Sequence, residues 1–545
     1  MVRQYIGARY VPKFMGTFDA TQAYEALCVV DNGMGTSYIS RVDTPAGTSL
    51  SDPTYWAVYG ASSGAIVNLQ NQVDALKAIA VTPEMFGAEG DGVTDDSQAM
   101  QDAMNFAKVV YLPKTSVYLI KDVTMPEGAI LLGPGKIIFD YADNTNCITT
   151  SGNNLIDGVE FTDNGGVYKA DPYAIISTFE VDNVAITNCN FHDLHIGYAA
   201  LFEHCNQCTF THNKVKDYSF TGVMALHTCT FLDFSYNAII DGHDTSQGLR
   251  YPICVSGYSG NNYGPASYIK CNYNYIKDAT PLWEGIDSHG AVNCEVIGNY
   301  IDRVMNGIAF GYPGSASGTL ADNNRNVIIK NNFVNTYTAG ANFNRGINVA
   351  GQATSIIKNV EISDNVIVCN DTVTAHTPIS AAIGIDCTGG VESLRICNNT
   401  IDAENDGVGI KSNSGDIINI LIEGNKITSV STDSNYQGIN LKDHISGKFK
   451  DVRVYDNTVS NAAGACMRTP TSTAYGELIQ CRSSMEFTNG GGDYVTNPQN
   501  NLPAAVQAVG KPGDFIANKY APSTTIAGYI CKQPGQWLQI DGTAL

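Results

Sequence analysis

Basic residues are scarce in this sequence. Lys and Arg together number 32, against 53 Asp and Glu, so the formal net charge is −21. No basic run is dense enough to follow a phosphate backbone, which predicts that nucleic acid is not a partner. The same charge argues against binding to an anionic membrane. A strongly acidic polysaccharide would need local Arg or Lys, so a neutral glycan suits the chain better.

Long apolar runs are also missing. The first residues hold no signal-peptide-like run and no apolar stretch reaches 18 residues, so we expect neither Sec-type export nor membrane insertion. The 15 Cys are an odd number scattered through strand-like runs, which indicates reduced core thiols. Cys205 and Cys208 have the spacing of metal ligands but no second pair at a zinc-finger interval. We therefore predict packing and no metal.

Strand-forming and turn-forming residues dominate what is present. With 43% hydrophobic and only 16% charged residues, the chain is expected to fold around a core. Helix-forming residues are sparse, whereas Asn, Gly, Thr, Ser, Ile, Val and Tyr are abundant. This balance favours strands joined by tight turns, so we predict a mostly β protein.

Residues 1–64 are predicted to form a small β module. Short strand-like runs are broken by the turn-rich segment at 45–56. Tyr55 and Trp56 serve either as the core of this module or as exposed aromatics that stack on sugar rings, and the core role is favoured. The order of YEALCVV, SYIS, PAG and DPTYW resembles the small chitin-binding-like modules near the start of many phage tail proteins. The resemblance implies attachment to phage tail or baseplate proteins.

Residues 65–82 are predicted to form a short helical stalk. Ile66, Leu69, Val73, Leu76 and Ala80 are spaced 3, 4, 3 and 4 residues apart, as on one seam of a coiled coil. Two heptads are too few to associate alone, but three chains held together by a larger domain could use them. The alternative is one amphipathic helix that lies on a neighbouring domain.

The segment at 85–120 predicts a short helix and a strand that cover one end of a solenoid. Its run FGAEGDGVTDD at 86–96, followed by VYLP at 110–113, resembles the opening of the pectate-lyase-like superfamily of phage tailspikes and plant-polysaccharide enzymes. The resemblance implies a right-handed parallel β-helix, which we place at 83–484. It implies no reaction, because lyases, hydrolases, epimerases and adhesins share the motif. Asp91, Asp95 and Asp96 are expected to serve turns and caps.

A repeated Asn marks the coils from about residue 189 onward. It stands in the pattern Asn-x-(Ile/Val/Phe) at variable intervals, which predicts coils of nearly constant core with outer loops of different length. Asn suits this place because it tolerates a left-handed turn and its amide can bond to the coils on either side. Cys189 is expected to fill the same inside slot. The markers are Asn213, Asn237, Asn274, Asn299, Asn331, Asn365, Asn399, Asn425 and Asn457.

A second strand of each coil begins with Gly followed by Ile or Val. If the Ile or Val points inward, the next residue and the one two further on face solvent. The first outward column is then Asp287, Ala309, Asn348, Asp386, Gly409 and Asn440, and the second is His289, Gly311, Ala350, Thr388, Lys411 and Lys442. The residues before each Gly form a third column of Glu284, Asn306, Arg345, Ile383, Asp406 and Gln437.

The stretch 283–290 carries the densest functional chemistry, and a related cluster lies one coil earlier, where the longest insertion begins. Trp283 offers a sugar-stacking face or a core plug. The candidate catalytic residues are Glu284, Asp287, His289, Asp244, His243 and Asp241. The candidate substrate-binding residues are Trp283, Arg250, Tyr251, Arg345, Asn348 and Asp386.

Paired carboxyl groups suit glycoside hydrolysis, which needs them about 5 Å apart for retention or about 6.5 to 9.5 Å for inversion. Because adjacent coils stand about 4.8 Å apart, carboxylates on one strand or on neighbouring coils can reach the inverting distance. Asp287 with Glu284 or Asp244 is the predicted acid and base pair, and His289 or His243 orients it or shuttles a proton. The alternative is that these residues are ordinary surface acids.

The pattern Asp-x-His-Gly at 287–290 resembles catalytic strands of several β-helix carbohydrate enzymes. Neither the polygalacturonase set of motifs nor a pectate-lyase set is present in order, which argues against both of those activities. A pectate lyase would need Ca²⁺ and an Arg or Lys base, and neither Arg250 nor Arg345 has a clear partner set. We therefore predict no cofactor.

The sequence thus predicts an all-β homotrimeric spike with small β modules at 1–64 and 485–545. The expected partner is a bacterial surface or capsular polysaccharide, which the protein binds and cleaves with water. The expected location is the phage tail of a virion. The rival predictions are a glycan-binding adhesin without activity, a polysaccharide lyase or epimerase, and a free extracellular enzyme.

Overall fold

The computed structural model divides the chain into two compact units, Met1–Val81 and Thr82–Leu545. The structure describes residues 12–33, 36–60, 80–141, 145–166, 168, 173–243, 251–256, 265–311, 325–337, 345–351, 356–370, 381–412, 415–429, 437–441, 449–460, 467–468, 479–482, 486–488, 515–517, 526–533 and 536–541.

The first unit is a four-stranded sheet of β1 (Lys13–Thr17), β2 (Cys28–Asp31), β3 (Ser37–Ser40) and β4 (Trp56–Gly60). Trp56 is only 2% exposed and lies in the core with Tyr24, Cys28 and Val30, while Tyr55 packs partly buried against this cluster. The core role is therefore confirmed for Trp56. The stalk predicted at 65–82 falls almost wholly outside the described residues.

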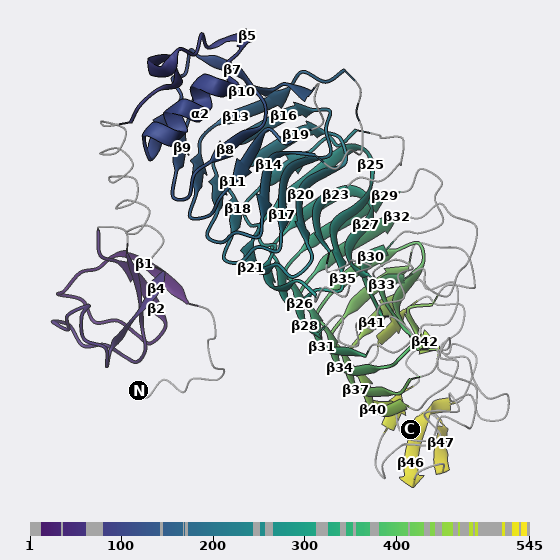
Figure 1. The fold of residues 1–545 in the computed structure, drawn as a ribbon. Helices are drawn as coiled ribbons and strands as arrows, with labels where there is room; N and C mark the ends of the chain where they lie inside the picture. Colours follow the sequence, from purple (N-terminus) through teal and green to yellow (C-terminus); the bar gives the residue numbers. More distant parts are fainter. Residues whose placement is uncertain are drawn as a thin grey trace. The chain divides into compact units, whose positions relative to one another are not determined.

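The second unit is a parallel β-helix, as the sequence predicted. Its coils stack side by side, so that strands far apart in the sequence become neighbours (Figure 1). One wall is a 14-stranded parallel sheet. Its strands are β6 (Val109–Tyr111), β9 (Ile130–Leu132), β12 (Leu155–Asp157), β15 (Ala185–Thr187), β18 (Thr209–Thr211), β21 (Thr230–Asp233), β24 (Ser267–Lys270), β26 (Val292–Ile297), β28 (Arg325–Lys330), β31 (Ile357–Ser363), β34 (Val391–Cys397), β37 (Ile417–Glu423), β40 (Phe449–Tyr455) and β43 (Ile479–Arg482).

The rest of each coil belongs to a 26-stranded sheet that bends around the solenoid. Its strands are β5 (Asp91–Asp95), β7 (Val117–Ile120), β8 (Val123–Met125), β10 (Lys136–Phe139), β11 (Ile148–Thr150), β13 (Glu160–Asp163), β14 (Ala174–Phe179), β16 (Asn190–Leu194), β17 (Tyr198–Glu203), β19 (Lys214–Tyr218), β20 (Thr221–Leu226), β22 (Ala238–Ile240), β23 (Tyr251–Ser256), β25 (Tyr275–His289), β27 (Tyr300–Gly311), β29 (Phe333–Tyr337), β30 (Arg345–Gly351), β32 (Val366–Asn370), β33 (Ala381–Cys387), β35 (Thr400–Ala403), β36 (Asp406–Ser412), β38 (Lys426–Ser429), β39 (Ile439–Asn440), β41 (Thr458–Ser460), β42 (Met467–Arg468) and β44 (Glu486–Thr488).

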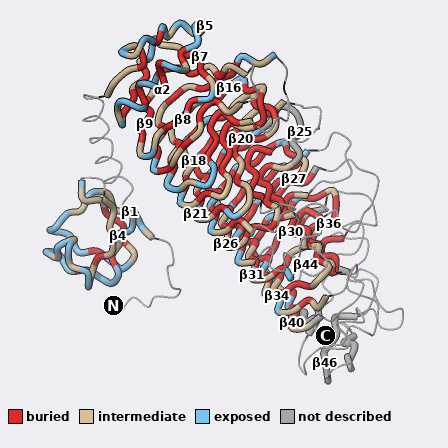
Figure 2. The backbone as a smooth tube through the Cα atoms, in the orientation of Figure 1, coloured by how far each residue is buried: buried red, intermediate tan, exposed pale blue. Residues whose placement is uncertain are grey.

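The core consists of rows of like residues, one per coil. Stacking in register places each inward side chain against its equivalent on the next coil, so apolar surface is removed from water along the whole solenoid. Figure 2 shows these buried stretches recurring from coil to coil. One row, with members at most 1% exposed, consists of Ile253, Ile286, Ile308, Ile347, Ile383, Val408 and Ile439.

The Asn markers form the predicted ladder with one correction. From Asn237 to Asn425, each ladder amide donates to the next Asn Oδ1, as from Asn299 to Asn332 at 2.9 Å and from Asn332 to Asn365 at 2.9 Å. The ladder residue of its coil is therefore Asn332, and Asn331 was the wrong choice because the tripeptide NNF fits the pattern in an ambiguous way. The backbone N–H of Cys189 donates to the Oδ1 of Asn213 at 2.9 Å, which confirms that Cys189 fills the same slot.

The left-handed turn lies one residue earlier than expected. Asn331, Asp364 and Asn398 have φ angles of 56° to 57°, whereas the ladder residue that follows each of them is absent from the positive-φ positions of the described chain. The marker Asn is thus retained for its amide bonds and not for its own backbone conformation. The residue before it makes the turn.

The Gly markers are explained by crowding between coils. A Cβ at Gly285 would stand 2.7 Å from the carbonyl oxygen of Gly307, and one at Gly307 would stand 2.4 Å from that of Gly346. Only Gly fits at these two positions, so each Gly marker indicates where its coil turns a corner. At Gly384 the predicted register is wrong, because Asn348 lies opposite Gly384 and Ala350 lies opposite Asp386. Ala382, two residues before Gly384, stands opposite the marker Gly346, and an even shift keeps each side chain on its predicted face.

The end of the β-helix is covered as predicted. The short helix η1 (Pro83–Phe86) precedes β5, and α2 (Ser97–Phe106) buries Met100, Ala103 and Met104. Its acidic neighbours serve turns: Asp91 accepts from the N–H groups of residues 93 and 94, and Asp95 from that of residue 97, while Asp96 accepts from residues 89 and 90. Their use in turns is confirmed, although Asp96 bonds the preceding loop and not its own helix.

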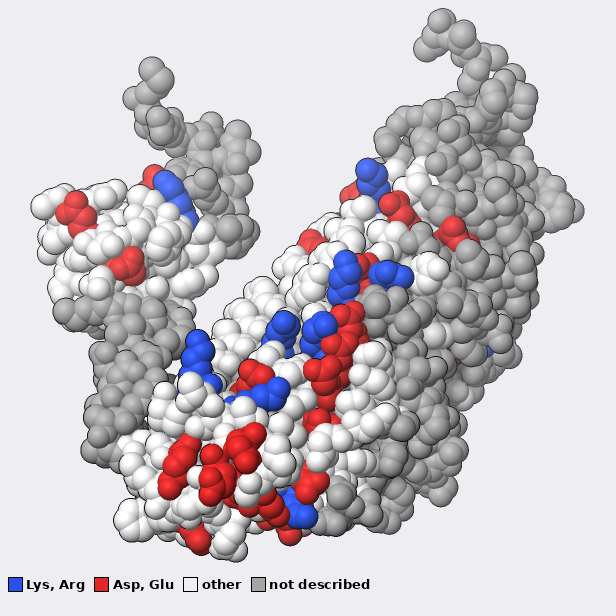
Figure 3. Space-filling view, turned by 90° about the horizontal axis from the view of Figure 1, so that it is seen from above, with Lys and Arg blue, Asp and Glu red and all other residues white. Residues whose placement is uncertain are grey.

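The surface charge is paired along the solenoid. Lys136 contacts Glu160 at 3.2 Å and Lys358 contacts Glu392 at 2.9 Å, each across neighbouring coils. On the face seen in Figure 3, acidic and basic side chains lie beside one another and no basic patch dominates. The 12 cysteines whose side chains the structure describes are buried and form no disulfide with one another, in agreement with core thiols. Among the described helices, none is long and apolar enough to span a bilayer.

The C-terminal part includes a three-stranded antiparallel sheet of β45 (Phe515–Ala517), β46 (Ile526–Gln533) and β47 (Gln536–Asp541). The last described strand of the large sheet, β44, pairs in parallel with β41. This arrangement is compatible with a small β module after the coils. The exact boundary stays a prediction.

Candidate functional site

Three residues of β25 come together at its C-terminal half. One oxygen or ring nitrogen from each of Glu284, Asp287 and His289 lies within 4.8 Å of the others. The neighbouring strand β23 places Cys254 opposite Asp287, and β27 places Asn306 opposite Glu284. The three side chains that the sequence grouped along one strand are therefore also grouped in space, and we refer to them as the β25 triad.

Asp287 is the buried member of the β25 triad. Its side chain is only 1% exposed, whereas that of His289 is 30% exposed. The thiol of Cys254 donates to Asp287 Oδ2 at 3.1 Å, and His289 Nε2 lies 3.1 Å from the same oxygen. The column argument predicted that Asp287 lies on the outer surface, and this prediction is wrong because its side chain is buried. It lies beneath Glu284 and His289, which are its routes to solvent.

The β25 triad has strongly shifted acidities. Burial, and then the negative charge of Asp287, raise the pKa of Glu284 well above its ordinary value. Burial also raises the pKa of Asp287 to about 7, although hydrogen bonds from neighbours oppose the change. Burial lowers the pKa of His289. These shifts favour the carboxylic-acid form of Glu284, which can donate a proton, and the neutral imidazole form of His289, which can accept one.

A polar row continues from the β25 triad along the next coils. Asn306 Nδ2 donates to Glu284 Oε1 at 3.4 Å, and Arg345 lies opposite Asn306 on β30. The pKa of Arg345 is lowered by burial, against the opposing charges of Asp386 and Glu284. On the other side, burial and the charges of Asp287 and Glu284 raise the pKa of Tyr251. Tyr251 and Arg345 therefore lie near enough to the β25 triad to be affected by its charge, and their binding of substrate stays a prediction.

Three buried acceptor oxygens lie in this row and in the adjacent one, in which Asp287, Ala309 and Asn348 stand in register. Asp287 Oδ1, Asn306 Oδ1 and Asn348 Oδ1 have no hydrogen-bond partner among the described residues. A buried acceptor without a donor costs about 1–3 kcal/mol, so such groups are rare unless a ligand or water meets them. The row is therefore suited to a ligand that carries several hydroxyl groups.

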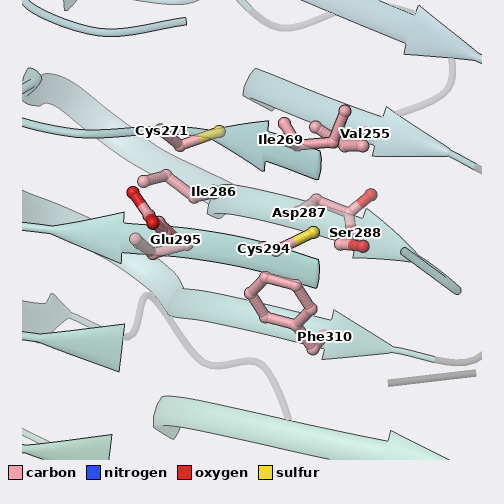
Figure 4. A pocket seen from close by; sticks show the side chains of 10 residues that line it. Val255, Ile269, Cys271, Ile286, Asp287, Ser288, Cys294, Glu295 and Phe310 are labelled. Carbon is pink, nitrogen blue, oxygen red and sulfur yellow. The ribbon is translucent and has the colours of Figure 1, made fainter. Parts of the chain in front are cut away.

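The cavity behind Asp287 is not the ligand site. It has a volume of about 10 Å³ and is lined by Val255, Ile269, Ile286, Phe310 and the two thiols of Cys271 and Cys294, among others (Figure 4). This space holds one water molecule at most. A ligand of Asp287 would have to approach from the side of Glu284 and His289.

Two predicted catalytic residues of the preceding coil, Asp241 and His243, are not part of the β25 triad. His243 contacts Asp217, with Nε2 3.1 Å from Oδ1, and stacks on Tyr168 with ring centroids 4.0 Å apart. Asp241 lies in a left-handed turn with φ of 58°. Among the described residues, neither has a contact with the β25 triad. Asp244 and Arg250, and the side chain of Trp283, lie outside the described part of the chain.

Sequence reasoning missed Cys254 because its coil lacks the Gly marker. The register that pairs Ile253 with Ile286 places Pro252 where other coils have Gly. Because proline has no backbone N–H that must be paired, it can occupy the corner position that Gly holds in the other coils. An alignment on the inward Ile instead of on the Gly would have placed Cys254 beside Asp287.

The β25 triad could hold a small divalent ion, but its fit to Ca²⁺ is poor. Ca²⁺ takes six to eight oxygen ligands, and the described residues offer two carboxylates and one imidazole. A second group of the same kind, Glu203, His204 and His227, is the other described cluster able to bind a metal.

We expect the wild-type protein to lose stability as the pH rises from about 4 to about 7. The folded pKa of Asp287, about 7, lies above the ordinary 3.8, so the folded state holds this proton more tightly than the unfolded chain. At about 1.4 kcal/mol per pKa unit, the loss is on the order of 4 kcal/mol. It is complete above pH 7 and absent below pH 4.

Urea unfolding of wild type and Asp287→Asn across this pH range tests the prediction. The free energy of unfolding of the variant should exceed that of the wild type increasingly as the pH rises. Parallel pH profiles of the two proteins would contradict the raised pKa.

Comparison with known proteins agrees with the fold. The family model described as rhamnogalacturonase A/epimerase, pectate lyase-like, matches residues 81–259, which end before the β25 triad. The chain is 12% identical to a solved tailspike protein mutant of E. coli bacteriophage HK620, with a TM-score of 0.53, over 86% of this chain and 92% of that chain.

Two curated phage proteins are also similar in sequence. The capsule K30/K69-specific depolymerase of Klebsiella phage K64-1 is 26% identical over 45% of this chain and 33% of its own length. The preneck appendage protein of Bacillus phage PZA is 36% identical over 12% of this chain and 8% of its own length. The chain thus spans a third or less of these relatives. Taken with the coils and the capping motif, these findings show a parallel β-helix whose first part, residues 81–259, is similar in sequence to the pectate-lyase-like family model.

Proposed function

We propose that this protein binds a bacterial surface polysaccharide and cleaves it at the β25 triad. The observation that carries the proposal is the row of buried acceptor oxygens on Asp287, Asn306 and Asn348, which begins at a carboxyl pair of raised pKa. Sugar hydroxyl groups are the natural donors to such a row, and the carboxyl pair supplies acid and base chemistry. The similarity to a phage capsule depolymerase supports the same substrate class.

Glycoside hydrolysis suits the β25 triad best. Glu284, whose raised pKa favours its protonated form, donates its proton to the glycosidic oxygen as that bond breaks. One oxygen of each carboxyl group lies within 4.8 Å of the other, which is closer than inversion needs and nearer the spacing of about 5 Å of retaining enzymes. The inverting distance that the sequence suggested is therefore not met by this pair. In the retaining course, Asp287 attacks the anomeric carbon and water then releases the sugar with Glu284 as the base.

A lyase is the second candidate, and Arg345 is the observation that favours it. Arg345 lies two coils from Glu284 in the same row, and burial weakens its hold on its proton. A guanidinium there can neutralise a uronate carboxylate while the neutral His289 accepts a proton from the sugar ring. This course leaves an unsaturated product and consumes no water.

The whole protein is proposed to act on a virion. Similarity to a preneck appendage protein and to a phage depolymerase supports a place in the phage tail or neck. The first unit would then attach the protein to other tail components, and three copies would form the spike. A glycan-binding adhesin of the same fold would share the row of acceptors but not the need for Glu284 and Asp287.

Product analysis on a panel of purified bacterial capsular polysaccharides tests the function. We expect the full-length protein to release new reducing ends from at least one glycan without absorbance of a conjugated enoate. If the new reducing ends appear together with that absorbance, the reaction is elimination and not hydrolysis. Measurable binding to a glycan with neither product would leave the adhesin as the function.

A further inference from the structure

A groove crosses five neighbouring strands of the 14-stranded sheet, whereas the β25 triad belongs to the 26-stranded sheet. Its volume of about 460 Å³ lies within the range of about 300–1,000 Å³ that is usual for ligand clefts. Its lining residues come from β28, β31, β34, β37 and β40. These strands cover about 19 Å along the solenoid, since each of the four steps between them is about 4.8 Å. The groove therefore suits an elongated ligand.

One side of the groove is an outer row of short polar side chains. Its members stand in register on four successive strands, have left-handed φ angles between 54° and 59°, and are Asn326, Asn359, Ser393 and Asn419. The amide of Asn359 donates to Asn326 Oδ1 at 2.9 Å, and that of Asn419 donates to Ser393 Oγ at 3.2 Å. The serine side chain is shorter than asparagine, and no such bond joins Asn359 to Ser393 in the described chain. The row is therefore broken in the middle of the groove, where both side chains can meet a ligand.

The floor of the groove carries its charged residues. In register on the five strands it consists of Ile328, Glu361, Arg395, Leu421 and Arg453. Arg453 is held by Asp451, with Nε and Nη2 each 2.9 Å from one carboxylate oxygen. Glu361 Oε1 accepts from Ser363 Oγ at 2.9 Å. Arg395 is exposed and has neither a hydrogen bond nor an ion pair with the described residues, so its guanidinium is open to a ligand.

We propose that this groove binds a stretch of an acidic polysaccharide, with a sugar carboxylate on Arg395. The spacing of the coils is close to the length of one sugar residue in an extended chain, so each coil can meet one sugar. A guanidinium binds a carboxylate through two parallel hydrogen bonds. The Ser393 hydroxyl, which lines the groove two residues before Arg395, can donate a third. Asn359 Oδ1 then accepts from a sugar hydroxyl.

The rest of the floor fits the same ligand. Ile328 and Leu421 present apolar side chains on either side of the charged pair, and such surfaces pack on the C–H faces of sugar rings. Glu361 stands opposite Arg395 on β31 and repels a carboxylate, which places the acidic group on the Leu421 side of Arg395. A neutral glycan would leave Arg395 without an anion, so charge complementarity favours an acidic glycan.

Binding of purified capsular polysaccharides that contain uronic acids tests the site, measured by surface plasmon resonance. The inference rests on the proposed binding of a polysaccharide but not on its cleavage, so the parent is the full-length Glu284→Gln protein. We expect Arg395→Gln to weaken binding of at least one of these glycans by about tenfold or more, because charge-assisted hydrogen bonds are about twice as strong as neutral ones. Reduction of the glycan carboxylates to alcohols should weaken binding to the parent similarly. It should change nothing further for Arg395→Gln, since both changes remove the same contact.

Ser393→Asn and Lys270→Gln are the matched variants. The positive φ of Ser393 suits Asn, so Ser393→Asn closes the break in the outer row without strain and should lose binding as Arg395→Gln does. Lys270 stands in the floor row two strands before Ile328, outside the groove, and Lys270→Gln should bind as the parent does.

Three results would overturn the proposal. The first is that no uronate polysaccharide binds the parent, and the second is that Arg395→Gln and Ser393→Asn both bind as tightly as Lys270→Gln. The third is that Arg395→Gln separates copies of the chain in analytical ultracentrifugation, which would make the groove an interface between copies. Binding that depends on Arg395, in a protein whose wild type releases no product, would support this site and remove the proposed cleavage.

Discussion

Asp287→Asn is expected to lower the rate of polysaccharide cleavage by about 1,000-fold or more while the protein stays folded. The amide keeps the shape of the side chain but cannot attack a sugar or hold a negative charge beside Glu284. Positioned acid and base groups contribute about 10²- to 10⁴-fold each, and the charge of Asp287 also raises the pKa of Glu284. The measurement is kcat on the glycan that the wild type cleaves, followed by release of reducing ends.

The same change is expected to stabilise the protein above neutral pH. Asp287 carries a charge at a position that is only 1% exposed, and an amide there avoids that cost. A variant that is both more stable and inactive indicates that the wild-type residue is kept for its function although it lowers the stability of the protein. Glu284→Gln should also be inactive, because the amide has no acidic proton to donate to the leaving oxygen.

Asp364→Asn is the matched control for this experiment. Asp364 is a surface acid 3.2 Å from Lys330, and its φ of 57° suits Asn as well as Asp. Its activity should equal that of the wild type within about twofold, since exposed ion pairs contribute little. If Asp287→Asn retains activity within a few-fold of wild type, the catalytic groups lie elsewhere in the chain.

Asn365→Ala is expected to reduce the free energy of unfolding by about 4 kcal/mol or more. Asn365 is 1% exposed and its amide donates to the carbonyl of Ile329 and to Asn399 Oδ1, at 3.0 and 2.9 Å. Its own Oδ1 accepts from the backbone N–H and the side chain of Asn332, both at 2.9 Å. Truncation removes these four buried hydrogen bonds, which contribute about 0.5–1.5 kcal/mol each, and takes the acceptor from the buried backbone N–H of Asn332, which costs about 1–3 kcal/mol more.

Urea unfolding followed by far-UV circular dichroism measures this loss. Asn105→Ala is the control, because Asn105 lies exposed on α2 and bonds only Gln101 among the described residues. It should change the free energy of unfolding by at most about 0.5 kcal/mol. If Asn365→Ala also falls within 1 kcal/mol of wild type, the ladder amides are not what holds neighbouring coils together.

The errors in the sequence-based register have local causes. In the NNF tripeptide two adjacent Asn compete for one ladder position, and the coil selects Asn332 because it alone is followed by an outward Phe333 and the inward Val334. At Gly384 the marker is displaced by two residues from the corner of its strand. An even displacement left the inward and outward assignment intact, so only the partner across the coils was wrong.

The candidate site was predicted only in part for a related reason. Glu284, Asp287 and His289 belong to one strand, and their proximity follows from a local pattern. His243 was assigned to the same site from sequence proximity to Asp244, but it contacts Asp217 and Tyr168 instead. The position of Cys254 beside the triad and the burial of Asp287 depend on neighbouring coils, so they could not be predicted from one strand.

The sequence by itself determined that this protein is a capped ladder of β coils with an Asn at one corner, a Gly at another and an acidic strand at 284–289. These features are local, because strand alternation and turn chemistry act within a few residues. Only the tertiary structure decided which residues are neighbours across coils, that Asp287 is buried beneath His289, and that Glu203, His204 and His227 meet. Loops of different length separate successive coils, so the lateral register is set by packing of the inward rows and not by spacing along the chain.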